Sequence, residues 1–336
     1  MNATRGVEGS TPGKWICLLT ALEGVVGFIG NLLVCFVILR VKFLHNRANY
    51  LLVNLAVADT LLCLYSVFNC LAVHENFALI RIVPTNVGGK ELFCRLLASR
   101  YFSWAFSCAS AYNLCVVTLE RYVAIVHPLQ YERKLTATRM TFLIALSWTT
   151  SFLFSTPLLF SRESSKDPDK ACLEFGYPSL IYPVSVGVFL FLLSFLIPIM
   201  SMSFAYYKMQ VTLKRQANAL NLQHARAAAY DLVIARQRLV NMLTIVVGAQ
   251  IILWTPSYIN SLICLYPSDN ALFAFCGSTR YIYFRGISNF AFYLNSVINP
   301  IIYEFKYKKF RQGFKIACCS CFKRRGNNRV DADLSP

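Results

Sequence analysis

The sequence predicts an all-α membrane protein, a bundle of seven transmembrane helices followed by a short amphipathic helix on the cytoplasmic side. Two observations predict this fold class. Of the 336 residues, 56% are hydrophobic and only 15% are charged, and long apolar segments follow one another along the chain. Each is long enough to cross the bilayer core, which takes about 20 helical residues. The segments are 15–39, 51–73, 96–126, 140–160, 178–207, 239–265 and 281–304.

The distribution of lysine and arginine predicts the orientation of these spans. Basic residues gather after the first, third, fifth and seventh spans, and loops with such an excess stay in the cytoplasm. Residues 1–14 are then extracellular, 15–304 form the transmembrane domain, and the C-terminus is cytoplasmic. The first span lacks a small-residue cleavage pattern and is expected to remain as a signal anchor. Asn2 opens an Asn-Ala-Thr glycosylation sequon, which only a luminal N-terminus could use.

The net charge of +17 suits the anionic inner leaflet, because it is concentrated beside the membrane spans. A nucleic-acid partner is therefore not expected. The four histidines show neither metal-ligand spacing nor a paired nucleophile, so we expect no enzyme. No internal repeat is evident, which disfavours the repeat-built transporters. A seven-helix transporter or channel remains one interpretation of such a bundle.

The connection between the fifth and sixth spans is rich in Ala, Leu, Gln and Arg, which favour helix. Both spans are therefore expected to extend into the cytoplasm as helices. After the seventh span, Phe310, Phe314 and Ala317 recur at helical spacing among basic residues, which predicts an amphipathic interfacial helix over 305–317. A cytoplasmic tail, 318–336, follows. Its first cysteines stand where acyl chains could hold the helix to the membrane, unless they are reduced thiols. They are Cys318, Cys319 and Cys321.

Several polar residues lie at similar depth inside apolar spans. They are Asn31, Asp59, Ser110, Asn295, Ser296 and Asn299. Ionisable groups inside spans are costly and usually functional, so we expect these side chains to converge on one polar pocket around Asp59. A kink at Pro300 would free backbone carbonyls for the same network. The alternative is that each polar group only joins a pair of helices. At the inner end of the third span, the adjacent Glu120 and Arg121 can form an ion pair.

These motifs occur one per span and in a fixed order. They are Gly30-Asn31, "NLAVAD" ending at Asp59, Glu120-Arg121-Tyr122, Trp148, Pro198 with Tyr206, "WTP" from Trp254 to Pro256, and "NPIIY" from Asn299 to Tyr303. Together they resemble the rhodopsin-like (class A) G protein-coupled receptors, most closely the peptide-binding branch. The resemblance covers nearly the whole chain.

The resemblance implies a mechanism and its residues. A sodium pocket, with sodium as the one expected metal and no other cofactor, would comprise Asp59, Ser110, Asn295, Ser296 and Asn299. The activation switches would be Arg121, Glu120, Tyr206, Trp254, Pro256, Pro300 and Tyr303. An agonist would shift the population toward a form with the sixth helix moved outward. That form would activate a heterotrimeric G protein at the plasma membrane, while arrestin recruitment looks weak because the tail has few hydroxyl residues.

The resemblance also implies a disulfide between Cys94 and Cys172. Cys94 stands 27 residues before Arg121, more than is usual in the family, so we expect a bulge at the top of the third span. A second disulfide could join Cys276 to Cys264 or to Cys17. The remaining span cysteines are interpreted as packing residues, and they are Cys35, Cys63, Cys108 and Cys115.

Three positions depart from the family pattern. Gln250 replaces the usual aromatic residue one turn below Trp254, and Arg236 stands where some members place an acid that holds Arg121. Leu253 is a minor change.

Two residues exclude two classes of ligand. Tyr293 replaces the lysine that retinal would need, and Ser103 replaces the carboxylate expected of an amine receptor. The inward-facing outer positions are predicted to be Asn69, Arg100, Ser103, Tyr258, Ser261, Arg285, Asn289 and Tyr293. We expect a neuropeptide or peptide hormone. Arg100 and Arg285 could instead grip a small anionic or lipid ligand, extend into water, or pair with an acidic loop residue such as Glu174. Glu23 lines the pocket or faces other helices.

Overall fold

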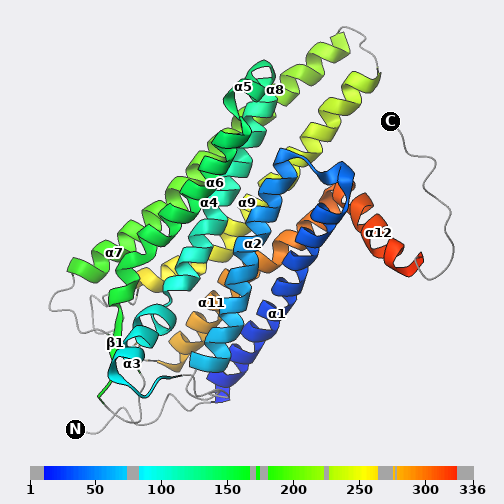
Figure 1. Ribbon diagram of the computed structural model, residues 1–336. Coiled ribbons are helices and arrows are strands. Elements are labelled where there is room, and N and C mark those ends of the chain that lie inside the picture. The colour runs from blue at the N-terminus through cyan, green and yellow to red at the C-terminus, as the bar shows by residue number, and fades with distance from the viewer. Residues whose placement is uncertain are drawn as a thin grey trace.

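The computed structural model describes residues 11–73, 83–166, 172–174, 181–222, 227–263, 275–276 and 278–323. Long helices packed side by side make up most of this part of the chain (Figure 1). The spans, in order, are α1 (Thr11–Arg40); α2 (Arg47–Phe68) with η2 (Asn69–Val73); α3 (Val87–Phe93), η3 (Cys94–Ala98) and α4 (Tyr101–Val126); α6 (Ala137–Ser155) with η5 (Thr156–Phe160); α7 (Ile181–Phe191), η6 (Leu192–Leu196) and α8 (Ile197–Leu222); α9 (Ala227–Ile263); and α11 (Thr279–Lys306). The predicted seven-helix bundle is confirmed.

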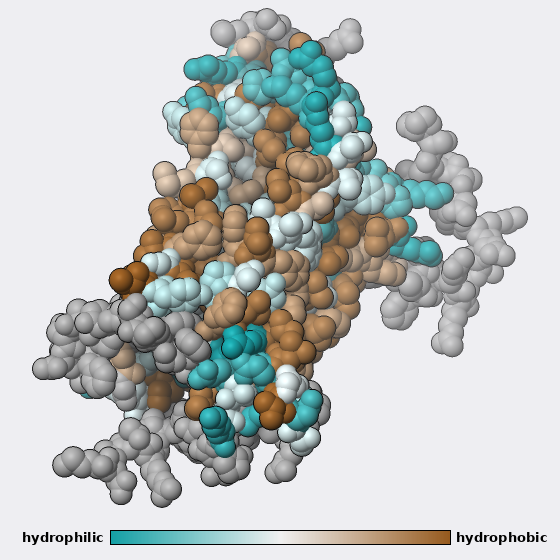
Figure 2. All heavy atoms as spheres, turned by 60° about the vertical axis from the view of Figure 1, so that its left-hand side comes forward, coloured by the Kyte–Doolittle hydropathy of each residue, from teal (hydrophilic) through white to brown (hydrophobic). Residues whose placement is uncertain are grey.

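Hydropathy separates the seventh span from the rest. Six helices in the described part of the chain are long and apolar enough to cross a membrane, and α11 is not among them. Its asparagines, Asn289, Asn295 and Asn299, lower its hydropathy although its length of 28 residues suffices. Figure 2 shows apolar side chains gathered around the middle of the molecule and hydrophilic ones toward its ends. The polarity of α11 therefore points inward, toward the site.

The connecting elements lie at opposite ends of the bundle (Figure 1). The end predicted to be cytoplasmic is called the inner end, and the opposite end the outer end. α3 and the hairpin of β1 (Arg162–Ser164) and β2 (Cys172–Glu174) lie at one end, and α5 (Tyr131–Lys134) lies at the other (Figure 1). Near α5, α8 and α9 extend beyond the bundle as the predicted helical prolongations. Two 3-10 turns, η1 (Lys42–Leu44) and η4 (Pro128–Gln130), complete the described connections at this inner end.

The amphipathic helix α12 (Lys308–Lys323) differs from its predicted bounds of 305–317. It starts later because α11 continues to Lys306, and Tyr307 then takes an extended backbone conformation. It ends later because its helical backbone continues to Lys323, so Cys318, Cys319 and Cys321 lie within the helix and not after it. Its apolar side packs on the inner end of the bundle, where Phe310 and Ala317 are buried.

The top of the third span carries the predicted bulge. The π-helical turn η3 follows α3, and Arg100 then interrupts the helix with a φ of 65°. Among the described residues Arg100 is the one non-glycine residue with positive φ. A π turn accommodates an extra residue within a helix, and a left-handed residue costs a non-glycine side chain strain that the surroundings must impose. The added length between Cys94 and Arg121 is absorbed in these two features.

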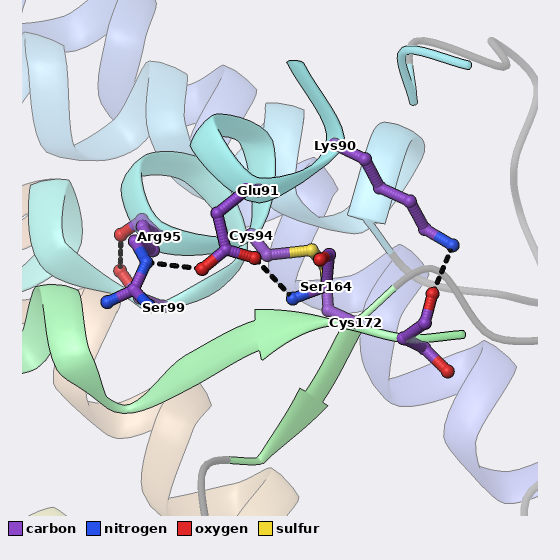
Figure 3. The surroundings of a disulfide bond; sticks show 8 residues. Lys90, Glu91, Cys94, Arg95, Ser99, Ser164 and Cys172 are labelled. Carbon is purple, nitrogen blue, oxygen red and sulfur yellow. Dashed lines mark hydrogen bonds and ion pairs between the residues drawn. A yellow bond between two sulfur atoms is a disulfide. The ribbon is translucent and has the colours of Figure 1, made fainter. Parts of the chain in front are cut away.

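The disulfide between Cys94 and Cys172 ties this bulge to the β hairpin, with the two Cα atoms 5.6 Å apart. Polar contacts reinforce it (Figure 3). Glu91 accepts a hydrogen bond of 2.8 Å from the backbone N–H of Ser164 and pairs with Arg95, and Lys90 donates to the Ser165 carbonyl at 2.7 Å. The implied pairing is therefore present, and it holds the outer end of the third span in place.

A disulfide between Cys17 and Cys70 was not predicted. It joins α1 to η2 with a Cα–Cα distance of 5.5 Å, so Cys17 is not the partner of Cys276 and that alternative is wrong. Cys276 is itself disulfide-bonded, but Cys264 lies outside the described residues, and their pairing stays a prediction. The four span cysteines interpreted as packing residues, Cys35, Cys63, Cys108 and Cys115, are free and at least half-buried.

Candidate functional site

The polar centre of the bundle is built around Asp59 on α2, which is fully buried. Ser110 on α4 and Ser296 on α11 each donate a hydrogen bond of 2.7 Å to its Oδ1 atom, and Asn299 on α11 donates one of 2.8 Å to its Oδ2 atom. A carboxylate removed from water needs such partners. Three helices are thereby joined at one acid, in the arrangement that the sequence predicted.

The proline in α11 connects the first helix to this centre. Pro300 has no N–H to donate to the carbonyl of Ser296, four residues earlier, so that carbonyl lacks its helical partner. Asn31 on α1 supplies the replacement, because its Nδ2 atom lies 2.9 Å from the Ser296 oxygen. The same Nδ2 atom bonds the Gly27 carbonyl at 2.9 Å. The helix-breaking residue is thus tolerated because another helix satisfies the freed group.

Two side-chain amide oxygens of α11 can still accept a hydrogen bond or bind a cation. The Oδ1 atoms of Asn295 and Asn299 are buried without a hydrogen-bond partner among the described contacts. Hard cations prefer oxygen ligands, and a carboxylate, two hydroxyls and free amide oxygens supply them. The donor set therefore fits the predicted sodium ion. Ser110, Ser296 and Asn299 each donate directly to Asp59, whereas no described hydrogen bond joins Asn295 to this group.

Above the acid lies a cluster of aromatic rings at the outer half of the bundle. Tyr258 packs on Trp104 with ring centroids 5.5 Å apart, and Trp254 stacks on Phe292 at 5.2 Å. Phe292 also contacts Tyr293. Trp254 is 1% exposed, although its Nε1 atom has no partner among the described contacts. Together these rings form a buried apolar cluster.

Three of the predicted ligand-contacting residues lie on or beside this cluster. Ser103 shares a hydrogen bond of 3.0 Å with the Tyr293 hydroxyl, and Tyr258 shares one of 2.6 Å with Ser194. The first bond joins the third span to the seventh. Ser103, Tyr258 and Tyr293 are all buried, so each would face a ligand only from within the bundle.

The other predicted ligand residues are more peripheral. Ser261 donates to the Ser257 carbonyl of its own helix, and Asn69 and Asn289 are half-buried. Arg285 is exposed and lies 6.0 Å from the ring centroid of Tyr281. Arg100 is exposed as well, yet it acts electrostatically on the Tyr293 hydroxyl. These five residues are not brought together by any described hydrogen bond or ion pair.

At the inner end, Glu120 and Arg121 form the predicted ion pair. The Arg121 Nε atom is 3.1 Å from Glu120 Oε2, but the alignment is too poor for a hydrogen bond, so the contact is one of charge. Glu120 is held more firmly by Tyr131 of α5, whose hydroxyl donates to Oε1 at 2.8 Å. Burial and this hydrogen bond raise the pKa of Tyr131 to about 12, so it remains a donor at neutral pH.

A cavity of about 510 Å³ opens beside this pair. Arg121 and Arg236 both line it, which places two like charges where an acid would have held Arg121. Arg47 lines it as well, and pairs with Glu132 at 2.7 Å. The full lining is Asn46, Arg47, Ala48, Glu120, Arg121, Ala124, Ile125, Tyr131, Glu132, Arg236 and Leu239.

The remaining predicted switches sit between the two ends. Tyr206 shares a hydrogen bond of 2.7 Å with Thr118. The Tyr303 hydroxyl is buried without a partner among the described contacts, as are both amide atoms of Gln250. Pro256 lies inside α9 and Pro300 inside α11. Buried polar groups usually have partners, whereas these have none among the described contacts.

Sequence reasoning missed several residues that complete the site. Thr118, Ser194 and Tyr131 bind Tyr206, Tyr258 and Glu120, respectively. Thr118 stands two helical turns after Ser110 on the same face of the helix, which was an available signal. The other two depend on how separate helices pack, and no local pattern reveals that.

Comparisons with known proteins agree with this architecture. The family model described as "7 transmembrane receptor (rhodopsin family)" matches residues 30–303. Trace amine-associated receptor 7e of Rattus norvegicus is 32% identical over 317 residues, covering 91% of this chain and 83% of that protein. Neuromedin-U receptor 2 of Mus musculus is 30% identical over 310 residues, covering 89% of this chain and 74% of that protein.

Proposed function

This chain belongs to the rhodopsin family of G protein-coupled receptors, and from that premise we propose that its extracellular ligand is a neuropeptide or peptide hormone. One observation carries the proposal. Ser103, at the position where an amine receptor is expected to hold a carboxylate, is engaged with Tyr293. A ligand must therefore make its contacts elsewhere, and a peptide can reach both the aromatic cluster and the exposed Arg100 and Arg285. The name of neuromedin-U receptor 2 is compatible with a peptide.

A small amine is the second candidate, and the names of the trace amine-associated relatives favour it. An amine ligand would require a carboxylate at another position, because position 103 is a serine. A small anionic or lipid ligand is a third candidate, because arginine binds carboxylates in a bidentate fork.

The proposed mechanism is a population shift. A sodium ion at Asp59, Ser110, Asn295, Ser296 and Asn299 would stabilise the resting bundle through its charge and its oxygen ligands. An agonist that binds the open form more tightly would oppose it by no more than its differential affinity. Movement of α9 away from the bundle would widen the cavity beside Arg121 for a G protein. In the same step Tyr206 would leave Thr118 and the unpaired Tyr303 hydroxyl would gain a partner.

Nucleotide exchange on a G protein tests the proposed function. Cells that express the chain would be screened with peptide and amine libraries, and each hit would be tested with purified receptor and G protein. A peptide that accelerates exchange supports the first proposal, and activation by amines alone rejects it. For an acidic ligand, Arg100→Glu is expected to abolish the response, with Arg280→Glu at the start of α11 as the matched charge reversal. Ligand-independent ion or substrate flux in liposomes would instead indicate a transporter or channel.

Modifications and further partners are part of the same proposal. Glycosylation of Asn2, which lies outside the described residues, would appear as a mobility shift on glycosidase treatment. Acylation of Cys318, Cys319 or Cys321 on α12 would appear as hydroxylamine-sensitive labelling. Weak arrestin recruitment would appear as a small response relative to that of the G protein. The proposed locale is the plasma membrane, with the N-terminus outside.

A further inference from the structure

Glu23 on α1 is a buried acid without a protein partner. It is 7% exposed, and neither carboxylate oxygen has a hydrogen-bond partner among the described contacts. None of the described ion pairs includes it. Burying an unpaired ionised carboxylate costs several kcal/mol. A side chain kept in this condition is a candidate for binding a group that comes from outside the protein.

The packing of α1 on α11 fixes what Glu23 faces. A Cβ atom on Gly286 would lie 2.6 Å from Ile16, one on Gly27 would lie 2.8 Å from Val297, and one on Gly30 would lie 3.4 Å from Pro300. The two residues of each pair are separated by the same number of residues in the sequence, as expected when two helices run parallel.

The same separation pairs Glu23 with Tyr293. Their electrostatic interaction agrees with this register, and so does that of Glu23 with Cys63 on α2. Glu23 therefore lies at the seam of α1, α2 and α11, at the depth of the bond between Tyr293 and Ser103.

This seam is closed toward the lipid and toward the outside. Leu22 and Val26 take the lipid side of α1, with exposures of 62% and 52%. The Cys17–Cys70 disulfide clamps α1 to the end of α2 on the outer side of Glu23. On the inner side, Gly27 packs so closely that a Cβ atom would meet the Cys63 sulfur at 2.5 Å. On the remaining side, Tyr293 stands between Glu23 and the aromatic cluster, because its ring contacts Phe292.

The hydroxyl donors around this seam are already engaged. Ser66 donates to the Cys63 carbonyl at 2.7 Å, and Thr20 donates to the Ile16 carbonyl at 2.9 Å. Tyr293 is occupied by Ser103. Arg100 is a described cation that acts electrostatically on Tyr293, but it is exposed and forms no described ion pair. The seam thus supplies a carboxyl group that is not paired with a cation in any described ion pair.

We infer that Glu23 is the counter-ion for a protonated amine of the ligand, reached from the aromatic cluster past Tyr293. This inference rests on the proposed receptor function and deepens it. An ammonium group would satisfy the carboxylate with charge-assisted hydrogen bonds, and aromatic ring faces attract the same cation on its way in. The amine could belong to a small molecule or to a peptide, as its N-terminus or a lysine. The third span has Ser103 where an amine receptor is expected to hold a carboxylate. Glu23 on the first span would supply that carboxylate instead.

Thermal stability of the purified, ligand-free receptor tests the inference. The probes are phenylethylamine and phenylethanol, which match in shape but differ in charge. We expect the amine to raise the melting temperature and the alcohol to have little effect. The Glu23→Gln variant should need at least about tenfold more amine for the same rise, since a buried charge pair is lost. The matched control is Glu163→Gln, which removes a half-buried carboxyl from β1 and should leave the amine response unchanged.

The inference is overturned if the amine stabilises the receptor no better than the alcohol, or if Glu23→Gln responds as the unchanged protein does. Two further arms identify the source of the amine. Any activating peptide is compared with its N-acetylated form and with forms in which each lysine is replaced by glutamine, and any activating amine with its alcohol.

Failure of the inference is distinguishable from failure of the proposed function. A receptor that still drives agonist-dependent nucleotide exchange with Glu23→Gln at full potency retains its function and loses only this counter-ion. Glu23→Gln is nearly isosteric, and equal surface expression would show that the variant folds.

Discussion

Two carboxylates lie buried in this bundle next to α11, and they are treated in opposite ways. Asp59 receives hydrogen bonds from three side chains on two other helices. Glu23 receives none among the described contacts. The surroundings explain the difference, because serine and asparagine face Asp59 whereas Gly24, Gly27 and Cys63 line the seam at Glu23. A buried acid that receives hydrogen bonds from the protein stabilises the fold. An acid that receives none favours the binding of a cation.

The strongest test of this contrast removes Asp59, the acid that receives hydrogen bonds from the protein. Asp59→Ala leaves the donors of Ser110, Ser296 and Asn299 buried and unpaired. At about 1 kcal/mol for each orphaned donor, we expect a loss of about 3 kcal/mol in the free energy of unfolding. The melting temperature of detergent-purified receptor would report it as a drop of several degrees. A variant as stable as the unchanged protein would show that these hydrogen bonds do not hold the three helices together.

Removal of Glu23, the acid without hydrogen bonds, is expected to raise the free energy of unfolding and not to lower it. Glu23→Leu replaces an unpaired buried carboxyl with an apolar side chain of similar size, so no donor is orphaned and a desolvation cost disappears. We expect the ligand-free receptor to gain about 1–2 kcal/mol, the usual penalty of an unsatisfied buried polar group. The same melting assay measures it. A destabilised Glu23→Leu variant would mean that Glu23 is bound by the protein, and the contrast with Asp59 would fail.

Sodium sharpens the contrast between the two acids. If the ion binds at Asp59, sodium should lower agonist affinity by roughly tenfold, a typical coupling between two sites. Asp59→Asn should blunt this effect because it removes the charge while leaving a side chain of the same shape. Competition binding with and without sodium, at constant ionic strength set by a bulky organic cation, would measure it. An undiminished sodium effect in Asp59→Asn would place the ion elsewhere, with Glu23 as the next site to test.

The difference between the two acids shows which features the sequence could predict. The spans, the convergence on Asp59 and the bulge between Cys94 and Arg121 followed from composition, from polar residues at matching depths and from one spacing. The Cys17–Cys70 disulfide did not follow, because it depends on which faces of α1 and α2 meet. Rotation of a helix about its axis leaves little trace in a pattern of apolar residues.

The same reason explains the errors within the site. Thr118 as the partner of Tyr206 and the isolation of Glu23 both depend on the register between helices. Neither is a property of one segment. The position of α12 depended instead on a single residue, since Tyr307 decides where α11 ends and the next helix starts. The residue types therefore predicted which side chains belong to the site. The packing of the helices decided which of those side chains have hydrogen-bond partners.

The smallest expected effect compares two matched serines. Ser110→Ala removes one of the donors to Asp59, and interhelical hydrogen bonds in membranes are worth about 0.6 to 1.7 kcal/mol. We expect a loss near 1 kcal/mol. Ser66→Ala, beside Glu23, removes a hydroxyl that donates to the Cys63 carbonyl of its own helix, and it should change the free energy of unfolding by less than about 0.5 kcal/mol. Both changes delete one buried oxygen, so their comparison isolates the acceptor. Equal losses would mean that the two serines differ only in position, and that Asp59 draws no special stabilisation from its donors.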